Sequence, residues 1–354
     1  MRKFLGVLVA FALAAAVARP AALSACTTFC ARTSDAVLFG RNYDFEIGGG
    51  ALLVNPRGLA KIGFSAAGPR WTTAYGSVTF NQFGRDFPMG GMNERGLVVE
   101  LMWLDVTEYP PADQRRELGV LEWIQYQLDT AATVAEVLDS DHVVRIGAGP
   151  PLHYLVSDAS GTSATLEYLG GRLVAHTGAA LPVAVLANST YEDSLVYWRR
   201  QGDTSRPGGS SSEARFARAA SQVGSLGRLA GQPAIDRAFA ILASVGQRIT
   251  RWTVVYDQTA RVVHFRTPGV TSVRTLPMSG LDWSCRGPVR ALDLDEPAGG
   301  DVSGRLQPYS AAANEAMVRR NHAASSVTKR TPPDEVLAIA AHPGRAVCEG
   351  RQVP

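Results

Sequence analysis

Residues 26–45 have the sequence CTTFCARTSDAVLFGRNYDF, in which two short β-prone runs follow one another. Thr27 to Arg32 and Val37 to Tyr43 are separated by the polar tetrapeptide TSDA, and this pattern predicts a β-hairpin. If the turn closes symmetrically, Cys26 lies opposite Asp44 or the residue before it. The hairpin would therefore bring a carboxylate close to a cysteine at the start of the first strand.

The first 25 residues have the features of a secretory signal peptide. Arg2 and Lys3 form a basic start, residues 5–17 are almost entirely apolar, and small residues lead up to Cys26. The apolar run falls short of the ~20 residues that a membrane-spanning helix needs. We therefore expect residues 1–25 to be a signal peptide and the protein to be periplasmic or secreted.

Cleavage before Cys26 would give a residue that carries both a thiol and a free α-amine. The amine, with a pKa of about 7.7–8.0, can act as the base for its own side chain, and the thiolate is a strong nucleophile. However, Ala16-Val17-Ala18 is a better signal-peptidase site than Leu23-Ser24-Ala25. Cleavage after residue 18 would leave a short propeptide of residues 19–25, which Cys26 itself could remove.

A second interpretation of the same cysteine belongs to a different class of function. Leu23-Ser24-Ala25-Cys26 resembles a bacterial lipobox. Lipidation there would block the sulfur and usually the amine, so the two interpretations exclude each other. The alternative is a non-catalytic surface lipoprotein that is lipidated at Cys26.

Strand-like and helical patterns alternate through the rest of the chain. Further strands are expected from short β-prone runs at residues 71–80, 97–104, 153–157, 164–168, 183–187, 252–256 and 262–266. Helices are expected at residues 118–128, 134–138, 233–244 and 310–320, and from Ser210 to Val223, where Ser210 and Glu213 would form a capping box. Hairpins that alternate with groups of helices indicate a layered α+β domain.

The four cysteines restrict the disulfide pattern only in part. Cys26 and Cys30 lie four positions apart on a strand, so their Cα atoms should be ~13 Å apart, too far for a disulfide. Cys285 and Cys348 either pair in an oxidising compartment or remain thiols. No Cys-x-x-Cys or His-x-x-x-His pair occurs, so we expect no metal.

The charge of the chain gives no indication of nucleic-acid binding. There are 35 basic and 32 acidic residues, and Arg2, Lys3 and Arg19 of the expected leader supply the whole excess. No basic run follows, and no later segment is apolar and long enough for a stable membrane span.

Five short motifs resemble those of one enzyme family, and they occur in the family's order. They are Cys26-Thr27-Thr28, Gly40-Arg41-Asn42-Tyr43-Asp44-Phe45, Gly91-Met92-Asn93-Glu94-Arg95-Gly96-Leu97, Leu186-Ala187-Asn188-Ser189 and Ala214-Arg215-Phe216. From Cys26 to about Thr267 the chain resembles the choloylglycine hydrolase family, which comprises penicillin V acylases, conjugated bile-acid hydrolases and related N-acyl amidases. The resemblance implies a four-layer αββα sandwich of the N-terminal nucleophile type. No Pro/Gly linker is long enough to require a second domain, so we expect a single domain over residues 26–354, with a C-terminal extension from about residue 296, where no family motif occurs.

The same resemblance implies roles for individual residues. Cys26 would be the nucleophile and, through its amine, the general base; Asp44 would accept from the α-ammonium, and Arg41 would favour the thiolate. The side-chain amide of Asn188 and the backbone N–H of Trp103 would form the oxyanion hole, and Arg215 would complete the charge network.

The strand pattern adds one constraint to these roles. Because Arg41 and Asp44 have opposite parity in a regular strand, we expect one of them to reach Cys26 from a strand end or a bulge.

Each residue also has a purely structural explanation. Arg41 and Asp44 could form an ordinary surface ion pair, Asn188 could be a turn or capping residue, and Trp103 could belong to the core.

The residue at position 103 bears on the substrate. Bile-acid hydrolases of the family tend to carry Asn there and the penicillin V acylases of Gram-positive bacteria Tyr. A Trp resembles the Gram-negative branch, which is associated with penicillin V and acyl-homoserine lactones. We therefore expect an acyl pocket walled by Trp103, Phe45 and Met102, with a conjugated bile-acid hydrolase as the alternative. The resemblance implies a small-molecule N-acyl amide as substrate and no cofactor, and a homo-oligomer is compatible with it.

Overall fold

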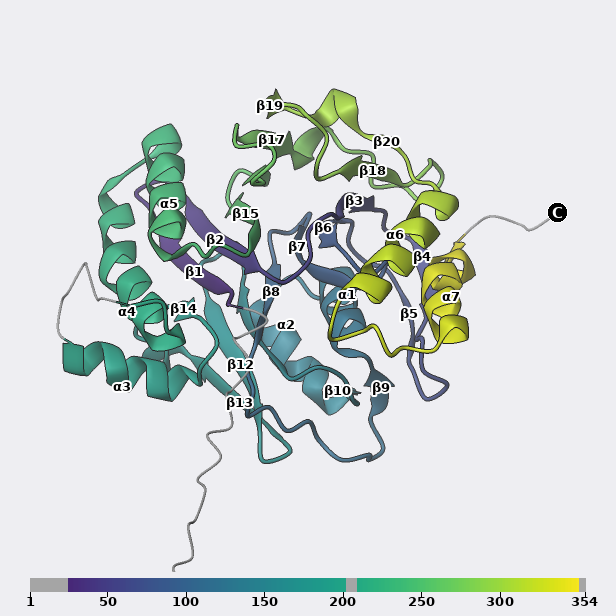
Figure 1. Cartoon of the computed structure of the whole chain (residues 1–354), viewed down its shortest axis with the longest axis horizontal. Helices are drawn as coiled ribbons and strands as arrows, with labels where there is room; N and C mark the ends of the chain where they lie inside the picture. The colour runs from purple at the N-terminus through teal and green to yellow at the C-terminus, as the bar shows by residue number, and fades with distance from the viewer. Residues whose placement is uncertain (1–24, 202–208, 350–354) are drawn as a thin grey trace, which may run out of the picture.

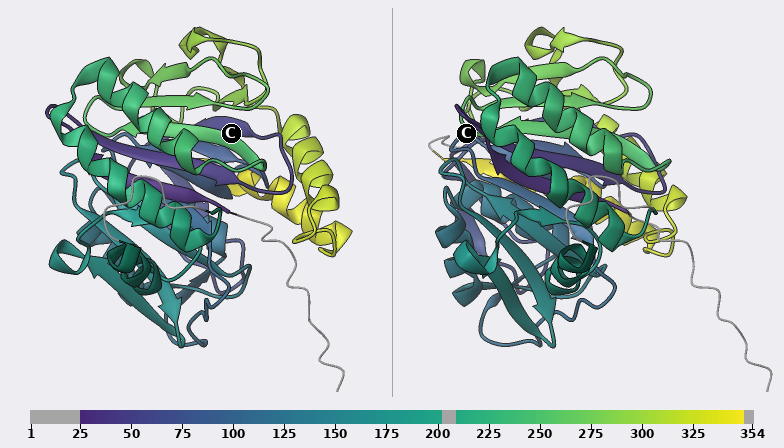
Figure 2. Two further views of the ribbon diagram at one scale, coloured as in Figure 1. Left: turned by 60° about the vertical axis from the view of Figure 1, so that its left-hand side comes forward. Right: turned by 90° about the vertical axis from the view of Figure 1, so that its left-hand side faces the viewer.

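The computed structural model describes residues 25–201 and 209–349. Apart from Ala25, the expected signal peptide and the candidate cleavage sites lie outside the described residues. Within the described part, two large sheets lie face to face, and helices cover their outer surfaces (Figures 1 and 2). The α+β class and the αββα sandwich expected from the sequence are thereby confirmed.

The first sheet has seven strands and carries the N-terminal hairpin. Its strands, in spatial order, are β14 (Val185–Leu186), β1 (Thr27–Arg32), β2 (Val37–Asp44), β15 (Thr250–Asp257), β16 (Val262–Arg266), β17 (Arg274–Pro277) and β19 (Gly300–Asp301). Its outer face is covered by α4 (Ser212–Val223) and α5 (Gly231–Val245), and α3 (Tyr191–Gln201) packs against α4.

The second sheet has nine strands. In spatial order they are β13 (Arg172–Thr177), β12 (Ser163–Leu169), β11 (Leu152–Ser157), β8 (Val98–Trp103), β7 (Pro88–Asn93), β6 (Ser77–Asn81), β3 (Ala51–Asn55), β18 (Arg290–Asp293) and β20 (Gln307–Pro308). Helix α1 (Val120–Thr130) lies on its outer face, and α2 (Val134–Asp139) follows directly. Smaller sheets join β9 (Arg116–Leu118) with β10 (Val144–Ile146), and β21 (Val347–Cys348) with β4 (Leu59–Ile62) and β5 (Arg70–Thr72).

The predicted hairpin is confirmed, and its register is well defined. Strands β1 and β2 pair antiparallel from Thr27 opposite Asn42 onward, so Cys26 faces Tyr43. A Cβ atom at Gly40 would come within 2.5 Å of the Phe29 ring. The glycine therefore lets an aromatic residue of β1 pack across β2.

Several other sequence expectations need correction. The strand expected at residues 71–80 is split into β5 and β6, because residues 73–76 between them are not in a strand. Gly76 leaves room for the Trp283 ring, which a Cβ atom there would meet at 2.1 Å. Helix α4 is capped by Ser211, whose side chain accepts from the Ala214 N–H, so the capping box at Ser210 is wrong by one residue.

Two helices were not expected. Helix α7 (Pro333–Ala341) begins where the sequence indicated only a proline-rich connection, because proline is well tolerated in the first turn of a helix. Helix α3 is rich in polar residues, and its apolar face consists of Tyr191, Leu195 and Trp198 at helical spacing, a pattern that the sequence analysis missed.

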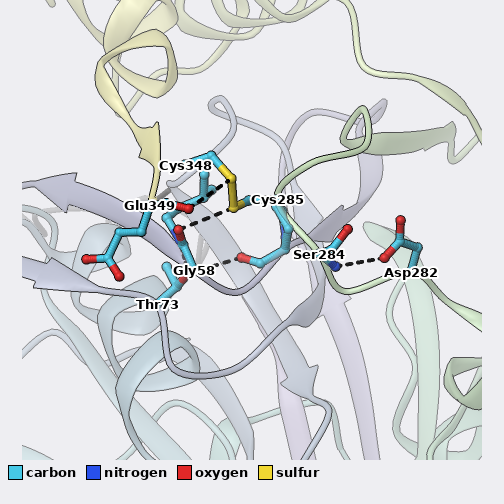
Figure 3. Close-up of a disulfide and its surroundings, with 9 residues drawn as sticks. Gly58, Thr73, Asp282, Ser284, Cys285, Cys348 and Glu349 are labelled. Atoms are coloured by element: carbon cyan, nitrogen blue, oxygen red, sulfur yellow. Dashed lines mark hydrogen bonds between the residues drawn. A yellow bond between two sulfur atoms is a disulfide. The ribbon is translucent and has the colours of Figure 1, made fainter. Parts of the chain in front are cut away.

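The C-terminal segment folds back onto the sandwich. Helix α6 (Ala311–Ala324) and α7 pack on one another at one side of the molecule (Figure 1). A disulfide joins Cys285 to Cys348 next to Gly58 (Figure 3), which decides the pairing that the sequence left open. Cys26 and Cys30 are not in a disulfide, as expected. Over the described ranges, every helix is too short or too polar to cross a membrane.

Candidate active site

Cys26 lies at the start of β1 and is fully buried. Side chains alternate along a strand, and Thr28, two residues further on, contacts Met102 of the opposite sheet through its hydroxyl. The Cys26 thiol therefore points into the space between the two sheets. There its Sγ lies 3.7 Å from Nη2 of Arg41 and 3.7 Å from the carbonyl oxygen of Asp44.

Arg41 brings a positive charge to the sulfur from β2. Its guanidinium forms a fully buried ion pair with Glu100 of β8, and its Nη1 donates to the Met89 carbonyl. The Tyr256 hydroxyl donates to Glu100 at 2.6 Å. A cation beside a thiol favours the thiolate, so this arrangement suits Arg41 for the role that the family resemblance implies.

Glu100 is a residue of this site that the sequence analysis missed. Gly90 on the neighbouring strand has φ +155°, and a Cβ atom there would overlap the Glu100 carboxylate. The glycine thus makes room for the carboxylate that holds Arg41. The available signal was a single acidic residue in the otherwise apolar run 97–104.

Asp44 approaches Cys26 from the other face of the sheet. Regular alternation along β2 places Arg41 and Tyr43 inside the sandwich and Asp44 toward the helices. Asp44 is also the last residue of β2 and pairs next to a bulge of β15 between Thr250 and Trp252, which agrees with the expectation of a strand end or a bulge. Cys26 presents its thiol to one face, and its backbone nitrogen lies next to Ala25, whose N–H donates to the Asp44 carbonyl at 3.4 Å.

The Asp44 carboxylate is incompletely satisfied. One oxygen accepts from the Thr250 hydroxyl, whereas Oδ2 is buried and has no hydrogen-bond partner among the described residues. Burial raises the pKa of Asp44 from 3.8 to about 6, against the lowering effects of Thr250, Arg215 and Arg41. A donor or positive charge placed beside Asp44 would relieve this burial cost.

Arg215 of α4 joins the start of β1 to Asn188. Its Nη1 donates to the carbonyl oxygens of Ala25 and Cys26 and to the Thr27 hydroxyl. Its Nη2 donates to Oδ1 of Asn188 at 2.8 Å. Because that contact fixes which end of the amide is oxygen, it orients the Asn188 NH₂ group.

Asn188 and Trp103, the two expected oxyanion-hole residues, lie next to each other. The Asn188 Nδ2 donates to the Trp103 carbonyl at 2.9 Å, and an amide nitrogen carries a second hydrogen for another acceptor. Leu104 N donates to Pro151 O, so by the alternation of an antiparallel ladder Trp103 faces Leu152 at a non-hydrogen-bonded position. The Trp103 N–H therefore points away from β11.

His153 is a second residue that the sequence analysis missed, and it supports the segment around Asn188. The buried His153 lies between Glu167, at 3.0 Å from Nδ1, and the carbonyl oxygen of Ala187, at 2.9 Å from Nε2. Glu167 also accepts from the Tyr191 N–H. These contacts hold the chain on both sides of Asn188.

A largely apolar cavity of about 310 Å³ adjoins the site. Its wall includes Trp103 and Phe45, as expected, together with Tyr43 and Met89. Cys26 does not itself line the cavity, but three lining residues connect the cavity to the site. Tyr43 lies opposite Cys26 in the hairpin, the Met89 carbonyl accepts from Arg41, and the Trp103 carbonyl accepts from Asn188.

Met102 does not belong to the cavity wall. It is fully buried, and its sulfur accepts from the Thr28 hydroxyl between the sheets. Alternation along β8 explains this, because it directs Met102 to the face opposite Trp103. Within the described ranges, no group of three or more His, Cys, Asp or Glu side chains is arranged to hold a metal.

Comparisons with known proteins agree with this geometry. A family model described as linear amide C–N hydrolases, choloylglycine hydrolase family, matches residues 26–201. A penicillin V acylase of Pectobacterium atrosepticum is 35% identical over 175 residues, which cover 43% of this chain. The match spans only 46% of that relative's length.

Solved structures extend the likeness over more of the chain. The penicillin V acylase from Agrobacterium tumefaciens superposes with a TM-score of 0.72 at 29% identity, covering 80% of this chain and 98% of that one. A variant of the conjugated bile acid hydrolase from Clostridium perfringens superposes with a TM-score of 0.62 at 18% identity, covering 80% and 96%. The second likeness concerns the fold alone.

The fold is that of the N-terminal nucleophile hydrolases. The chain belongs to the choloylglycine hydrolase family of linear amide C–N hydrolases. The alternative of a non-catalytic lipoprotein receives no support from these comparisons.

The burial of Asp44 predicts a pH-dependent stability in the uncleaved chain. A carboxyl whose pKa is about 6 when folded and 3.8 when unfolded contributes stability that is fully present below pH 3.8 and lost as the pH rises through 6. In a Cys26→Ala protein that retains Ala25, Asp44→Asn should therefore become more stabilising from acid to neutral pH, by ~3 kcal/mol in total.

Denaturant unfolding at a series of pH values measures this difference. The exposed Asp334→Asn serves as the control and should leave the pH dependence unchanged. Parallel stability curves for the Asp44→Asn protein and its parent would contradict the assignment.

Asn188 should act on the rate of amide hydrolysis. Arg215 and Trp103 fix the orientation of the Asn188 side-chain amide, and one of its two N–H hydrogens remains for a ligand. Asn188→Ala should therefore lower kcat by ~10²–10³ with little change in KM. Steady-state kinetics on an N-acyl amide measure both constants. A loss confined to KM would make Asn188 a binding residue, and unchanged kinetics would return it to the turn interpretation.

Proposed function

We propose that this protein is an exported acylase that hydrolyses N-acyl amides of the penicillin V and acyl-homoserine lactone type through a thioester on Cys26. The observation that carries the proposal is the position of Cys26 between two opposite charges. Its sulfur lies 3.7 Å from Nη2 of Arg41 on one face of β2. On the other face lies the carboxylate of Asp44, whose buried Oδ2 has no hydrogen-bond partner among the described residues.

The first step is activation of the thiol. Once the residues before Cys26 are removed, its α-amine takes the thiol proton, and the resulting ammonium is positioned to donate to Oδ2 of Asp44. The backbone bond from the Ala25 N–H to the Asp44 carbonyl supports this position, because it holds the residue before Cys26 beside Asp44. Arg41 stabilises the thiolate that remains.

The thiolate then attacks the amide carbonyl of the substrate. The negative charge that develops on the carbonyl oxygen is accommodated by the second Nδ2 hydrogen of Asn188 and the backbone N–H of Trp103. The ammonium of Cys26 returns a proton to the departing amine, and the acyl group stays on sulfur. Water, deprotonated by the α-amine, hydrolyses the thioester and restores the thiol.

Arg215 also contacts the peptide bond that must be cleaved to remove the residues before Cys26. In the chain that retains Ala25, Arg215 donates to the Ala25 carbonyl, which is the carbonyl of the peptide bond to be cleaved. A hydrogen bond to that oxygen would polarise it toward attack by the neighbouring thiol. This contact favours removal of residues 19–25 by Cys26 itself after signal-peptide cleavage.

The cavity beside the site favours an apolar acyl group. It is lined by a cluster of aromatic side chains that are largely buried: Tyr43, Phe45, Phe64, Phe83, Phe87 and Trp103. Stacking of an aromatic acyl group on such rings contributes ~0.5–1.5 kcal/mol beyond its burial, and each buried methylene adds ~0.8 kcal/mol. Phenoxyacetyl and medium-length fatty-acyl groups match this apolar lining. The similarity to proteins named penicillin V acylase supports the same choice of acyl group.

A panel of amides on correctly processed protein tests the substrate assignment. Penicillin V should have a higher kcat/KM than glycine-conjugated bile acids, because a rigid four-ring acyl group does not fit beside Trp103. Trp103→Ala should reduce this preference, since it removes the indole from the cavity wall. Trp198→Ala is a matched control, because Trp198 lies on α3, donates to Ser221 and is outside the wall.

The assignment fails if the wild-type protein prefers bile-acid conjugates over penicillin V and every acyl-homoserine lactone tried. That result would favour the conjugated bile-acid hydrolase alternative and leave the thioester mechanism standing.

A further inference from the structure

The acyl cavity has a wall that no motif of the sequence indicated. Besides side chains of the sandwich, it is lined by five residues from the C-terminal segment 310–348: His322, Val327, Thr328, Glu335 and Ile339. They come from α6, from the connection after it, and from α7. The end of the chain therefore builds part of the same cavity as Trp103 and Phe45.

This segment is fixed to the sandwich by hydrogen bonds to the loops beside the nucleophile hairpin. Asn321 donates to the Gln82 carbonyl at 2.6 Å, and the Gln82 side chain accepts from the Tyr43 hydroxyl at 2.7 Å. Glu46, two residues after Asp44, accepts from the Ser325 hydroxyl at 2.6 Å. The end of α6 is thus held against the chain that leaves β2.

Further contacts hold the second helix in place. Asn314 on α6 accepts from the Arg85 N–H at 2.9 Å and donates to the Ala340 carbonyl of α7 at 3.0 Å. Beyond α7, the Cys285–Cys348 disulfide and the pairing of β21 with β4 anchor the chain again. Because α7 packs on α6 and is held at its C-terminal end, its inward face is a defined surface.

Ile339 forms the apolar part of that surface. It is half-buried, packs against Val318, Val336 and Ala340, and faces the cavity. The catalytic side chains are reached instead through Tyr43, Met89 and Trp103, on the sandwich side of the cavity. Ile339 therefore belongs to the part of the wall that α7 forms, whereas the catalytic side chains belong to the sandwich.

We propose that the C-terminal segment 310–348 is a specificity-determining wall of the acyl pocket, and that Ile339, with Val327, sets the length of the acyl group that the enzyme accepts. This inference rests on the proposed acylase function. It gives the segment beyond the family motifs a role in substrate selection. A chain of one length fills the space up to Ile339, and a longer chain must displace a helix that packs on α6 and is anchored at its C-terminal end.

A homologous series of N-acyl amides with one common amine and acyl chains of about 4 to about 14 carbons tests the proposal, because each methylene is felt separately in an apolar pocket. Ile339→Ala enlarges the cavity, so the optimum should move to longer chains. The ratio of kcat/KM for a chain two carbons beyond the wild-type optimum to that for the optimum itself should rise about tenfold. Ile339→Phe should move the optimum to shorter chains.

Two further variants make the result specific. Leu337→Ala is the matched control, because Leu337 lies on the same helix, is 38% exposed and does not line the cavity; it should leave the length profile unchanged. Val327→Ala enlarges the pocket from the connection before α7, so it tests the wall without altering that helix.

The possible failures are distinguishable. If the wild-type protein hydrolyses none of the amides, the proposed function is wrong. If it hydrolyses them and the length profile stays the same in the Ile339→Ala, Ile339→Phe and Val327→Ala proteins, the proposed function stands and the C-terminal wall is overturned.

Discussion

The register between β1 and β2 is the constraint on which the rest of the site depends. With Thr27 opposite Asn42, Cys26 faces Tyr43, and its side chain points between the sheets. A slip by one residue would turn every side chain of β1 to the other face. The thiol would then lie under the helices, away from Arg41 and from the cavity, while the fold class would be unchanged.

The two faces of that hairpin carry separate sets of charged side chains. Inside the sandwich, Arg41 is balanced by Glu100, so the charge beside the sulfur is buried as a pair. Removal of one partner from such a pair usually costs several kcal/mol, because the remaining charge stays buried. On the helix side, Arg215 and Asp44 surround the backbone at the start of β1. One face thus acts on the sulfur and the other on the nitrogen of the same residue.

The sequence predicted what depends on local pattern. The hairpin follows from two β-prone runs around a turn, and helix α1 follows from apolar residues at helical spacing. Arg41, Asp44, Asn188, Trp103 and Arg215 were brought together by family resemblance, since no local rule joins residues 41 and 215. In the structure Arg41, Asp44 and Arg215 contact Cys26. Arg215 is linked to Asn188, and Asn188 to Trp103, and the chemical roles of all five are proposals.

The features that could not be predicted from the sequence depend on contacts between residues far apart in the chain. Glu100 is one acidic residue in an apolar strand until Gly90 allows it to reach Arg41. The inward or outward position of Met102 and Trp103 required the register of β8 with β11. Likewise, the pairing of Cys285 with Cys348 depends on β21 reaching β4 across the molecule.

The central claim is that the free α-amine of Cys26 is the base of the reaction. It is tested most directly by the turnover of homogeneous protein, verified by mass, that retains a single Ala before Cys26. The extra residue converts the amine to an amide that cannot take up a proton, while the thiol, Arg41 and the cavity remain. The account predicts that this protein folds and that its turnover of N-acyl amides vanishes. Undiminished turnover would contradict it.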